Sequence, residues 1–150
     1  MSKPKVIVTR RWHPEVEAVL VERFDTQLNE DDHPMSVAEL QDALQSADAV
    51  LPTVCDKVTA EVLGADNIRA RILGSNGVGF NHIDLDAAKA AGLTVTNTPE
   101  VLTDCTADLA MTLLLAVARR AGEGERHLRN GEWTGWRPTH MMGTSVTGKT

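Results

Sequence analysis

Short apolar runs alternate with amphipathic stretches along the chain up to residue 99. The apolar runs are rich in β-branched residues and end at turn residues, which is typical of buried strands. The pattern predicts strands over 5–9, 25–29, 49–51, 71–75 and 93–96, and the run at 25–29 is the weakest of them. Pro14 suits the first turn of a helix over 14–24, whose Val16, Val19 and Leu20 share one apolar face.

Further helices are predicted between the later strands. Ser36-Val-Ala-Glu39 has the spacing of a capping box, so a helix begins there. Shorter helices are expected over 59–63 and 85–91, the second closed by Gly92. Strand and helix therefore alternate, which indicates an α/β fold with a parallel sheet covered on both faces. Right-handed crossovers favour the strand order 2-1-3-4-5.

After residue 99 the pattern changes. Thr103 is placed to cap a helix over 104–120, and the interior of that helix, 107–118, is apolar on every side. We expect such a helix to be buried all round, between two domains or two subunits. The remaining residues hold a charged helical piece at 123–128 and two tryptophans, and they resemble an extended arm more than a domain.

Composition narrows the class of partner. The 150-residue chain carries a net charge of −6, which disfavours nucleic acid, and no run is long and apolar enough to span a membrane. The first eleven residues lack the apolar region of a signal peptide, and Cys55 and Cys105 lie far apart. No Cys/His spacing resembles a zinc site. We therefore expect a cytoplasmic protein without bound metal.

The sequence GTSVTGKT at 143–150 matches the phosphate-loop pattern G-x-x-x-x-G-K-[ST]. A working phosphate loop follows a buried strand and opens a helix, whose first amides hold the phosphates. Residues 136–142 contain Pro138 and no β-branched run, so no strand leads into this loop. We interpret the match as a polar turn without nucleotide binding.

Ligands of open parallel sheets bind beyond the carboxyl ends of the strands. Three loops fall there, at 10–13, 52–56 and 76–80, and the third is the most informative. Gly77 and Gly79 flank Val78, and two such glycines allow close approach of a ligand to backbone amides that form an anion-binding concavity. The alternative, a tight turn that only links strand to helix, stays open on spacing alone.

Other candidates are weaker. His82 follows the glycine loop, but no carboxylate partner is fixed by spacing, and a surface or helix-entry role is favoured. Arg10 and Arg11 could attract an anion or remain solvated surface charges. Five further residues have simple structural interpretations, as turn residues (His13, His33), helix caps (Asp84, Asp86) and a packed thiol (Cys105). We find no acid–base constellation and no catalytic residue within these 150 residues.

The segments 77–84, 88–92, 95–99 and 101–108, in this order and spacing, resemble the D-isomer-specific 2-hydroxyacid dehydrogenases. Within that family, 8–11, 101–104 and 130–138 are most similar to the glyoxylate/hydroxypyruvate reductase, or D-glycerate dehydrogenase, branch. The resemblance implies a flavodoxin-like substrate domain over 1–99, an interdomain helix over 100–121, and a dimerisation arm over 122–150. A Rossmann domain, inserted into the chain, is implied beyond residue 150.

The resemblance also implies roles for single residues. The backbone of Val78 and Gly79, next to Gly77, would hold the substrate carboxylate, and Thr53 and Val54 would form a second substrate loop. Thr103 would face the nicotinamide end of the cofactor. Trp136 would lie close to the substrate pocket of the neighbouring subunit.

The implied activity is reduction of a small 2-keto acid, such as glyoxylate or hydroxypyruvate, to the D-2-hydroxy acid by NADH or NADPH in a homodimer. The family's catalytic Arg, Glu and His would lie beyond residue 150, so we expect this chain alone to be inactive. The alternative is a stand-alone flavodoxin-like binding module. A flavodoxin would need glycine in the loop at 9–13, and a phospho-receiver would need aspartate where Leu51 and Pro52 stand.

Overall fold

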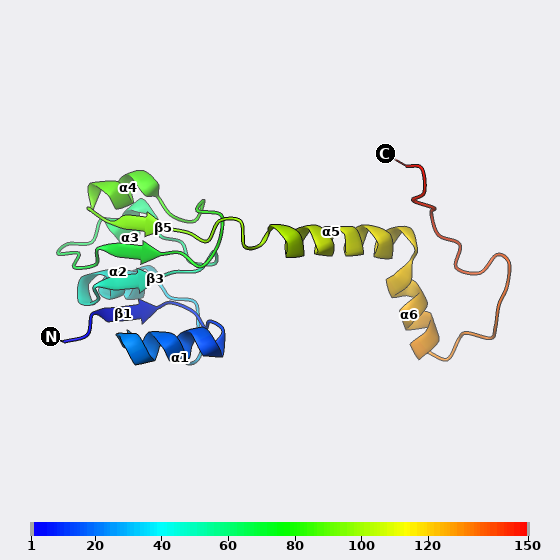
Figure 1. The fold of residues 1–150 in the computed structure, drawn as a ribbon, viewed down its shortest axis with the longest axis horizontal. Coiled ribbons are helices and arrows are strands. Elements are labelled where there is room, and N and C mark those ends of the chain that lie inside the picture. Colours follow the sequence, from blue (N-terminus) through cyan, green and yellow to red (C-terminus); the bar gives the residue numbers. More distant parts are fainter. Residues whose placement is uncertain (1, 150) are drawn as a thin grey trace. The chain divides into compact units, whose positions relative to one another are not determined.

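A computed structural model describes residues 2–149 and divides the chain into two compact units after Glu100. In the first unit five strands form one parallel sheet: β1 (Lys5–Val8), β2 (Asp25–Gln27), β3 (Ala49–Leu51), β4 (Ile72–Gly74) and β5 (Thr94–Thr96). Their order is β2-β1-β3-β4-β5, which confirms the predicted α/β fold and strand order (Figure 1). Each predicted strand exists, although most are shorter than the apolar run that encodes them.

The four helices of this unit are α1 (Pro14–Arg23), α2 (Val37–Ser46), α3 (Ala60–Leu63) and α4 (Leu85–Ala90). The capping box at α2 is confirmed, because the Ser36 hydroxyl accepts from the Glu39 amide at 3.3 Å while the Glu39 carboxylate accepts from the Ser36 amide at 2.7 Å. Asp84 caps α4 by accepting from the Ala87 amide at 3.0 Å. Asp86 lies within the first turn instead, so its predicted capping role is wrong.

The main core lies between one face of the sheet and α2, α3 and α4. The middle strands contribute Ile7, Val50 and Leu73, which alternate with residues of the opposite face, as the two-residue period of a strand requires. The helices contribute a complementary set of small and branched side chains, namely Leu40, Ala43, Leu44, Val62, Leu63 and Ala88. This core holds the sheet in place, and the sheet in turn positions the loops that follow the carboxyl ends of its strands.

The helix α1 departs from its predicted packing. Val16 and Val19, on its predicted apolar face, are each 43% exposed, whereas Glu17 is 4% exposed. The carboxylate of Glu17 is buried because it accepts from the guanidinium of Arg11 at 2.7 and 2.9 Å and from the Trp12 amide at 2.7 Å. Local ion pairing, not the apolar face, therefore anchors the first turn of α1 in this chain.

The second unit begins with the long helix α5 (Thr103–Ala118), and Arg120, in a left-handed conformation with φ of 56°, separates it from α6 (Ala121–Arg129). Thr103 is the first helical residue and the cap position is Leu102, without a side-chain capping bond, so the predicted capping role of Thr103 is wrong. Residues 130–149 form no helix or strand. They fold back on their own unit, because the Thr144 amide donates to the Ala118 carbonyl at 2.7 Å.

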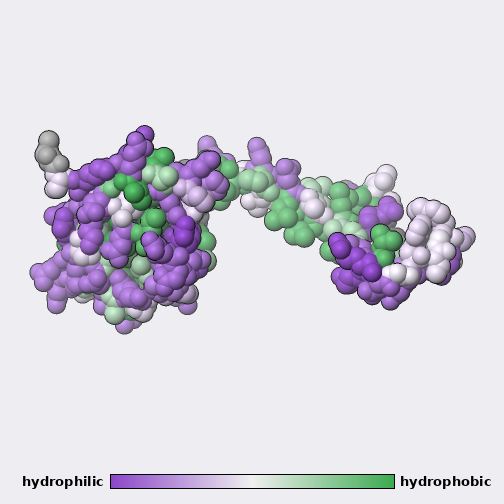
Figure 2. All heavy atoms as spheres, turned by 90° about the horizontal axis from the view of Figure 1, so that it is seen from below, coloured by the Kyte–Doolittle hydropathy of each residue, from purple (hydrophilic) through white to green (hydrophobic). Residues whose placement is uncertain are grey.

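No residue of α5 is buried within the described chain. Leu109 is 58% exposed and Val117 is 78% exposed, and Figure 2 shows hydrophobic side chains gathered along this helix. The expected burial all round is therefore not supplied by residues 2–149 themselves. Among the same residues no helix is both long and apolar enough to cross a membrane.

Candidate functional site

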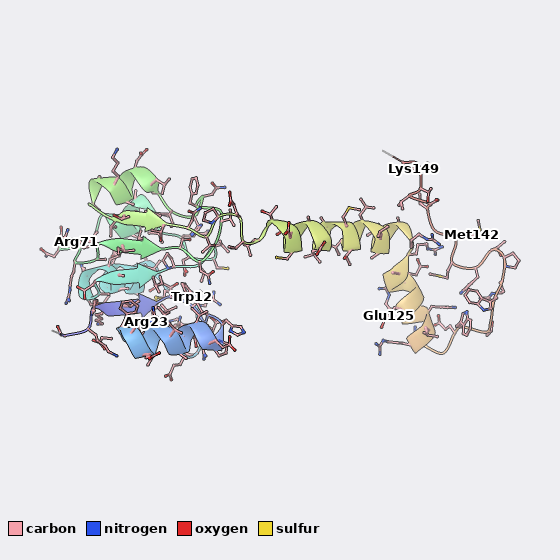
Figure 3. All side chains as sticks on the ribbon, viewed as in Figure 1. Trp12, Arg23, Arg71, Glu125, Met142 and Lys149 are labelled. Atoms are coloured by element: carbon pink, nitrogen blue, oxygen red, sulfur yellow. The ribbon has the colours of Figure 1, made fainter. Side chains whose placement is uncertain are left out.

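Because all five strands are parallel, their carboxyl ends meet at one edge of the sheet, where the three predicted loops lie. Figure 3 shows Trp12, in the first loop, at this edge and Arg71 at the opposite edge. The second and third loops are joined directly, since Thr53 pairs with Asn76 and the Asn76 amide donates to the Pro52 carbonyl at 2.8 Å. A second link joins Val58 to Ile83. The two loops thus form one structural unit.

The glycine loop is held at its carbonyl groups. The Thr98 amide donates to the Gly77 carbonyl at 3.0 Å, and the Asn97 side-chain amide donates to the Val78 carbonyl at 2.8 Å. Within residues 2–149, neither the Val78 amide nor the Gly79 amide donates a hydrogen bond to another protein group. Val78 is 39% exposed, so the loop presents two backbone donors that are free to bind an anion.

Gly77 and Gly79 have different steric surroundings. A Cβ atom at Gly77 would lie 2.4 Å from Val54 Cγ1, so only glycine allows the third loop to pack this closely on the second. A Cβ atom at Gly79 would meet nothing within 4 Å. Gly77 therefore serves the contact between loops, whereas the space above Gly79 is open to a ligand.

A surface cavity of about 510 Å³ adjoins the two loops. Its lining includes Val54 and Lys57 from the second loop region, and Gly79, Asn81 and His82 from the third. Lys57 is the only basic side chain of lysine or arginine type in this lining. The cavity thus combines the backbone of Gly79, an apolar side chain and one positive charge, a combination that suits a small carboxylic acid.

The structure reveals a buried carboxylate beneath these loops that sequence reasoning missed. Asp56 is 5% exposed, and its Oδ2 atom accepts from the Thr53 amide at 2.7 Å and from the Thr9 hydroxyl at 2.6 Å. The three-residue spacing of Thr53 and Asp56 is a local turn signal that could have identified half of this contact. The other half joins residues 47 positions apart and depends on the fold.

His82 is a structural link in the third loop. Its Nε2 atom lies 3.1 Å from the Ser75 hydroxyl, and burial lowers the pKa of the imidazole, while the charge of Asp56 opposes that shift. Within the described chain no carboxylate forms a hydrogen bond with His82. The preferred interpretation of His82 as a helix-entry residue fits this geometry better than a role as a general base.

The two arginines of the first loop are already paired. Arg10 donates to Asp32 at 2.9 and 3.1 Å, and this hydrogen bond raises the pKa of its guanidinium. Arg11 donates to Glu17, with the same effect on its pKa. Because each guanidinium has a carboxylate partner, neither is a free anchor for an anionic substrate, and the surface-charge interpretation is favoured.

The remaining small candidates do not gather at this edge as a site. Cys55 and Cys105 are free, exposed thiols within residues 2–149. Cys105 lies on α5, whose cover these residues do not supply, so its packing stays a prediction. His13 precedes α1 without a capping bond. His33 lies 3.0 Å from Glu39 and belongs to the start of α2. Among the described residues no group of His, Cys, Asp and Glu is arranged to hold a metal ion.

In the second unit, Thr103 and Trp136 are both exposed. Trp136 is 93% exposed and meets Trp133 edge to face, with ring centroids 5.9 Å apart. Residues 143–149 contain only a turn at 147–148, and no strand precedes them, which agrees with the interpretation of a polar turn. Lys149 lies near the end of the drawn chain (Figure 3). Thr150, the last residue of the phosphate-loop pattern, lies outside the described residues.

A parallel 2-1-3-4-5 sheet with paired loops at its carboxyl edge defines an α/β protein of the flavodoxin-like class. The chain belongs to the D-isomer specific 2-hydroxyacid dehydrogenase family, whose catalytic-domain model matches residues 6–148. It is 39% identical over 153 residues to a glycerate dehydrogenase of Hyphomicrobium methylovorum, with 100% of this chain and 47% of that protein covered. A glyoxylate reductase of Thermococcus onnurineus is 38% identical, with 99% and 45% covered.

A solved structure gives the same result. The NADPH-dependent glyoxylate/hydroxypyruvate reductase from Sinorhizobium meliloti, in complex with NADP and malonate, matches with a TM-score of 0.79 and 30% identity. That match covers 99% of this chain and 45% of the reductase. The chain therefore spans less than half the length of the relatives it matches.

Proposed function

We propose that this chain is the substrate-binding part of an NAD(P)H-dependent reductase that converts a small 2-keto acid, such as glyoxylate or hydroxypyruvate, to the D-2-hydroxy acid. The family membership supports the reaction class, and the names of the relatives support the substrate class. The observation that carries the proposal is that, within residues 2–149, the amides of Val78 and Gly79 donate to no protein group, and that they lie on an exposed loop at the carboxyl edge of the sheet.

In this proposal the amides of Val78 and Gly79 hold the substrate carboxylate. Both donors are fixed before the substrate arrives, because the loop is anchored through its carbonyl groups to Thr98 and Asn97. Preorganised donors orient the adjacent keto group without further ordering of the loop. Val54 borders the same cavity and excludes water on the side of the second loop, and Lys57 favours anionic ligands there.

A nicotinamide cofactor, when bound, supplies the hydride that reduces the keto carbon. We propose that Thr103, which is exposed in the first turn of α5, faces the nicotinamide end of this cofactor. The sequence contains no G-x-G-x-x-G dinucleotide loop, so we place the cofactor domain in the part of the relatives that this chain does not span. The proton donor, a histidine with a carboxylate partner, is proposed to lie there too.

We further propose a cytoplasmic homodimer in which α5 and the following arm contribute the interface. The exposed apolar surface of α5 and the exposed indole of Trp136 support this, because large apolar patches and tryptophans are typical of interfaces. A cofactor domain on one side and a second subunit on the other would give α5 the cover that residues 2–149 do not provide.

The test is turnover by the full-length protein that contains this chain. Oxidation of NADH and of NADPH is followed at 340 nm with glyoxylate, hydroxypyruvate and a matched series of larger 2-keto acids. We expect turnover with the small acids and the D-enantiomer as product. A protein that binds neither nucleotide and reduces none of these acids would show that the function is a different one.

A further inference from the structure

A chain of buried polar groups lies beneath the second loop and serves no role assigned so far. Thr9 is 0% exposed, and Asn29 and Asp56 are each 5% exposed. The Asp56 Oδ2 atom accepts three hydrogen bonds, from the Thr9 hydroxyl at 2.6 Å, the Thr53 amide at 2.7 Å and the Thr53 hydroxyl at 3.1 Å. A carboxylate buried this deeply is tolerated only when such donors replace water.

The same chain of groups connects the loop to the sheet. Thr9 directly follows β1, and its amide donates to the Leu51 carbonyl at 3.2 Å, so it is fixed against β3. The Asn29 side-chain amide donates to the Thr9 carbonyl at 2.7 Å. Asp56 thus ties the Thr53 backbone to a part of the molecule that is rigid through sheet pairing.

The position of Thr53 in turn decides where the third loop lies. Thr53 pairs with Asn76, and Val54 Cγ1 packs where a side chain at Gly77 would stand. If the contacts of Asp56 were lost, Thr53 and Val54 would be free to move, and the space that Gly77 occupies would no longer be defined. The amides of Val78 and Gly79 follow directly in sequence.

We propose that Asp56 is a positioning residue for substrate binding: through Thr9 and Thr53 it fixes the second loop, and thereby the two amides of the glycine loop. This inference rests on the proposed function, because it assumes that these loops bind the keto acid. Asp56 is buried and touches no substrate in this arrangement. Its effect is therefore on affinity for the keto acid and not on the chemical step or on the nicotinamide cofactor.

A purely structural role for Asp56 makes a different prediction. A residue that only stabilises the fold lowers the midpoint of unfolding when it is replaced, but it leaves the KM of the folded fraction unchanged. A positioning residue also changes the KM for keto acid, and a conservative replacement restores it in part. The three bonds of Asp56 converge on a single oxygen, so an asparagine amide oxygen can still accept some of them.

The experiment compares variants of the full-length protein. Asp56→Ala removes all three bonds, and Asp56→Asn is the conservative variant. Thr9→Val removes, with little change of shape, a hydroxyl that lies 2.6 Å from Asp56 Oδ2 and 3.2 Å from the Leu51 carbonyl oxygen. We expect Asp56→Ala to raise the KM for glyoxylate about tenfold or more, since charge-assisted hydrogen bonds are the strong ones. Thr9→Val should raise the KM for glyoxylate about threefold. The KM of Asp56→Asn should lie between those of the wild type and of Asp56→Ala. The KM for NADH or NADPH should be unchanged, and kcat should change less than the KM for keto acid.

Thr26→Val is the matched control. The Thr26 hydroxyl also donates to a backbone carbonyl, that of Leu20 at 2.8 Å, but it belongs to the edge strand β2. The Thr26→Val variant should therefore have the wild-type KM for glyoxylate. Amide hydrogen exchange of residues 53–58 gives a second readout, and it should be faster in Thr9→Val than in Thr26→Val.

The outcomes separate the two proposals. A wild-type protein without turnover would contradict the proposed function, and hydrogen exchange would still show whether Asp56 and Thr9 order the second loop. If Asp56→Ala does not fold, Thr9→Val and Asp56→Asn carry the test. Folded variants of Thr9 and Asp56 with wild-type KM and wild-type exchange in residues 53–58 would overturn the positioning role.

Discussion

Two glycines of the third loop, Gly77 and Gly79, differ in the space around them. Gly77 is confined by Val54, so its lack of a side chain serves packing between loops. Gly79 has open space, and within residues 2–149 its amide has no protein partner, so we propose that its lack of a side chain gives a ligand access to that amide. Sequence spacing predicted the pair as an anion site but did not distinguish the two roles.

We predict that Gly79→Val in the full-length protein raises the KM for keto acid and lowers kcat/KM, with the affinity for NAD(P)H nearly unchanged. The variant should fold, because the added Cβ meets nothing within 4 Å in this chain. A branched side chain there would obstruct the approach of a carboxylate to the amide, and loss of one charged hydrogen bond corresponds to about tenfold or more. Steady-state kinetics with glyoxylate measure the effect, and unaltered kinetics in a folded variant would contradict the anion site.

Gly77→Ala is the informative comparison for that experiment. Its Cβ would collide with Val54 Cγ1, so we expect a lower midpoint of thermal unfolding together with a raised KM. Gly79→Val should change the KM alone. The two variants therefore separate a packing defect from a binding defect within one loop.

At the scale of elements, the capping box at the start of α2 stabilises that helix, and its contribution depends on the ionisation of Glu39. The hydrogen bonds from the Ser36 amide and hydroxyl, followed by that from His33, lower the pKa of Glu39 to about 2. A carboxylate whose pKa is depressed by folding adds stability at pH values above its unfolded pKa, and this contribution is lost as pH falls toward the folded value. The window for Glu39 therefore runs from about pH 4.5 down to about 2.

We predict that Ser36→Ala destabilises the protein by about 1 kcal/mol at pH 7, the usual contribution of an N-cap side chain. The difference from wild type should shrink as pH falls from about 4.5 toward 2. The Ser36 hydroxyl, which only the wild type has, donates to the Glu39 carboxylate at 2.7 Å, and this bond no longer favours the wild type once Glu39 is protonated. Urea unfolding at a series of pH values measures this. A difference that stays constant over that range would show that the capping box is not coupled to Glu39 ionisation.

The exposed tryptophan of the second unit gives a further prediction for an element. We expect Trp136→Ala to weaken dimerisation of the full-length protein and to raise the KM for keto acid, because a central interface tryptophan contributes about 2 kcal/mol or more. That corresponds to a dimer dissociation constant about thirtyfold higher. Trp133→Ala is the matched control, since Trp133 is only 44% exposed and should affect dimerisation less. Analytical ultracentrifugation decides, and a variant that stays dimeric at nanomolar concentration with wild-type kinetics would rule the role out.

At the scale of the whole molecule, the fold was more predictable than the site. The alternation of apolar runs and amphipathic stretches is a local property, and it was enough to predict five parallel strands and their order. The buried carboxylates were not predictable in this way. Glu17 is buried because Arg11 folds back to it, and Asp56 is buried because Thr9, at the end of the neighbouring strand β1, donates to it. Neither partner follows from periodicity. The exposure of α5 also differs from the burial that its sequence predicts, because the residues that would cover it do not lie within residues 2–149.

The last prediction concerns the activity of the 150-residue chain by itself. Purified as 150 residues, it should not oxidise NADH or NADPH in the presence of glyoxylate, because the sequence has no dinucleotide loop and no described residue is placed as a proton donor. The full-length protein is the positive control, and the same preparation with Gly79→Val monitors contaminating host reductases. Turnover by the wild-type 150-residue chain that Gly79→Val reduces would show that these residues hold a complete active site, and our division of labour between this chain and a cofactor domain would be wrong.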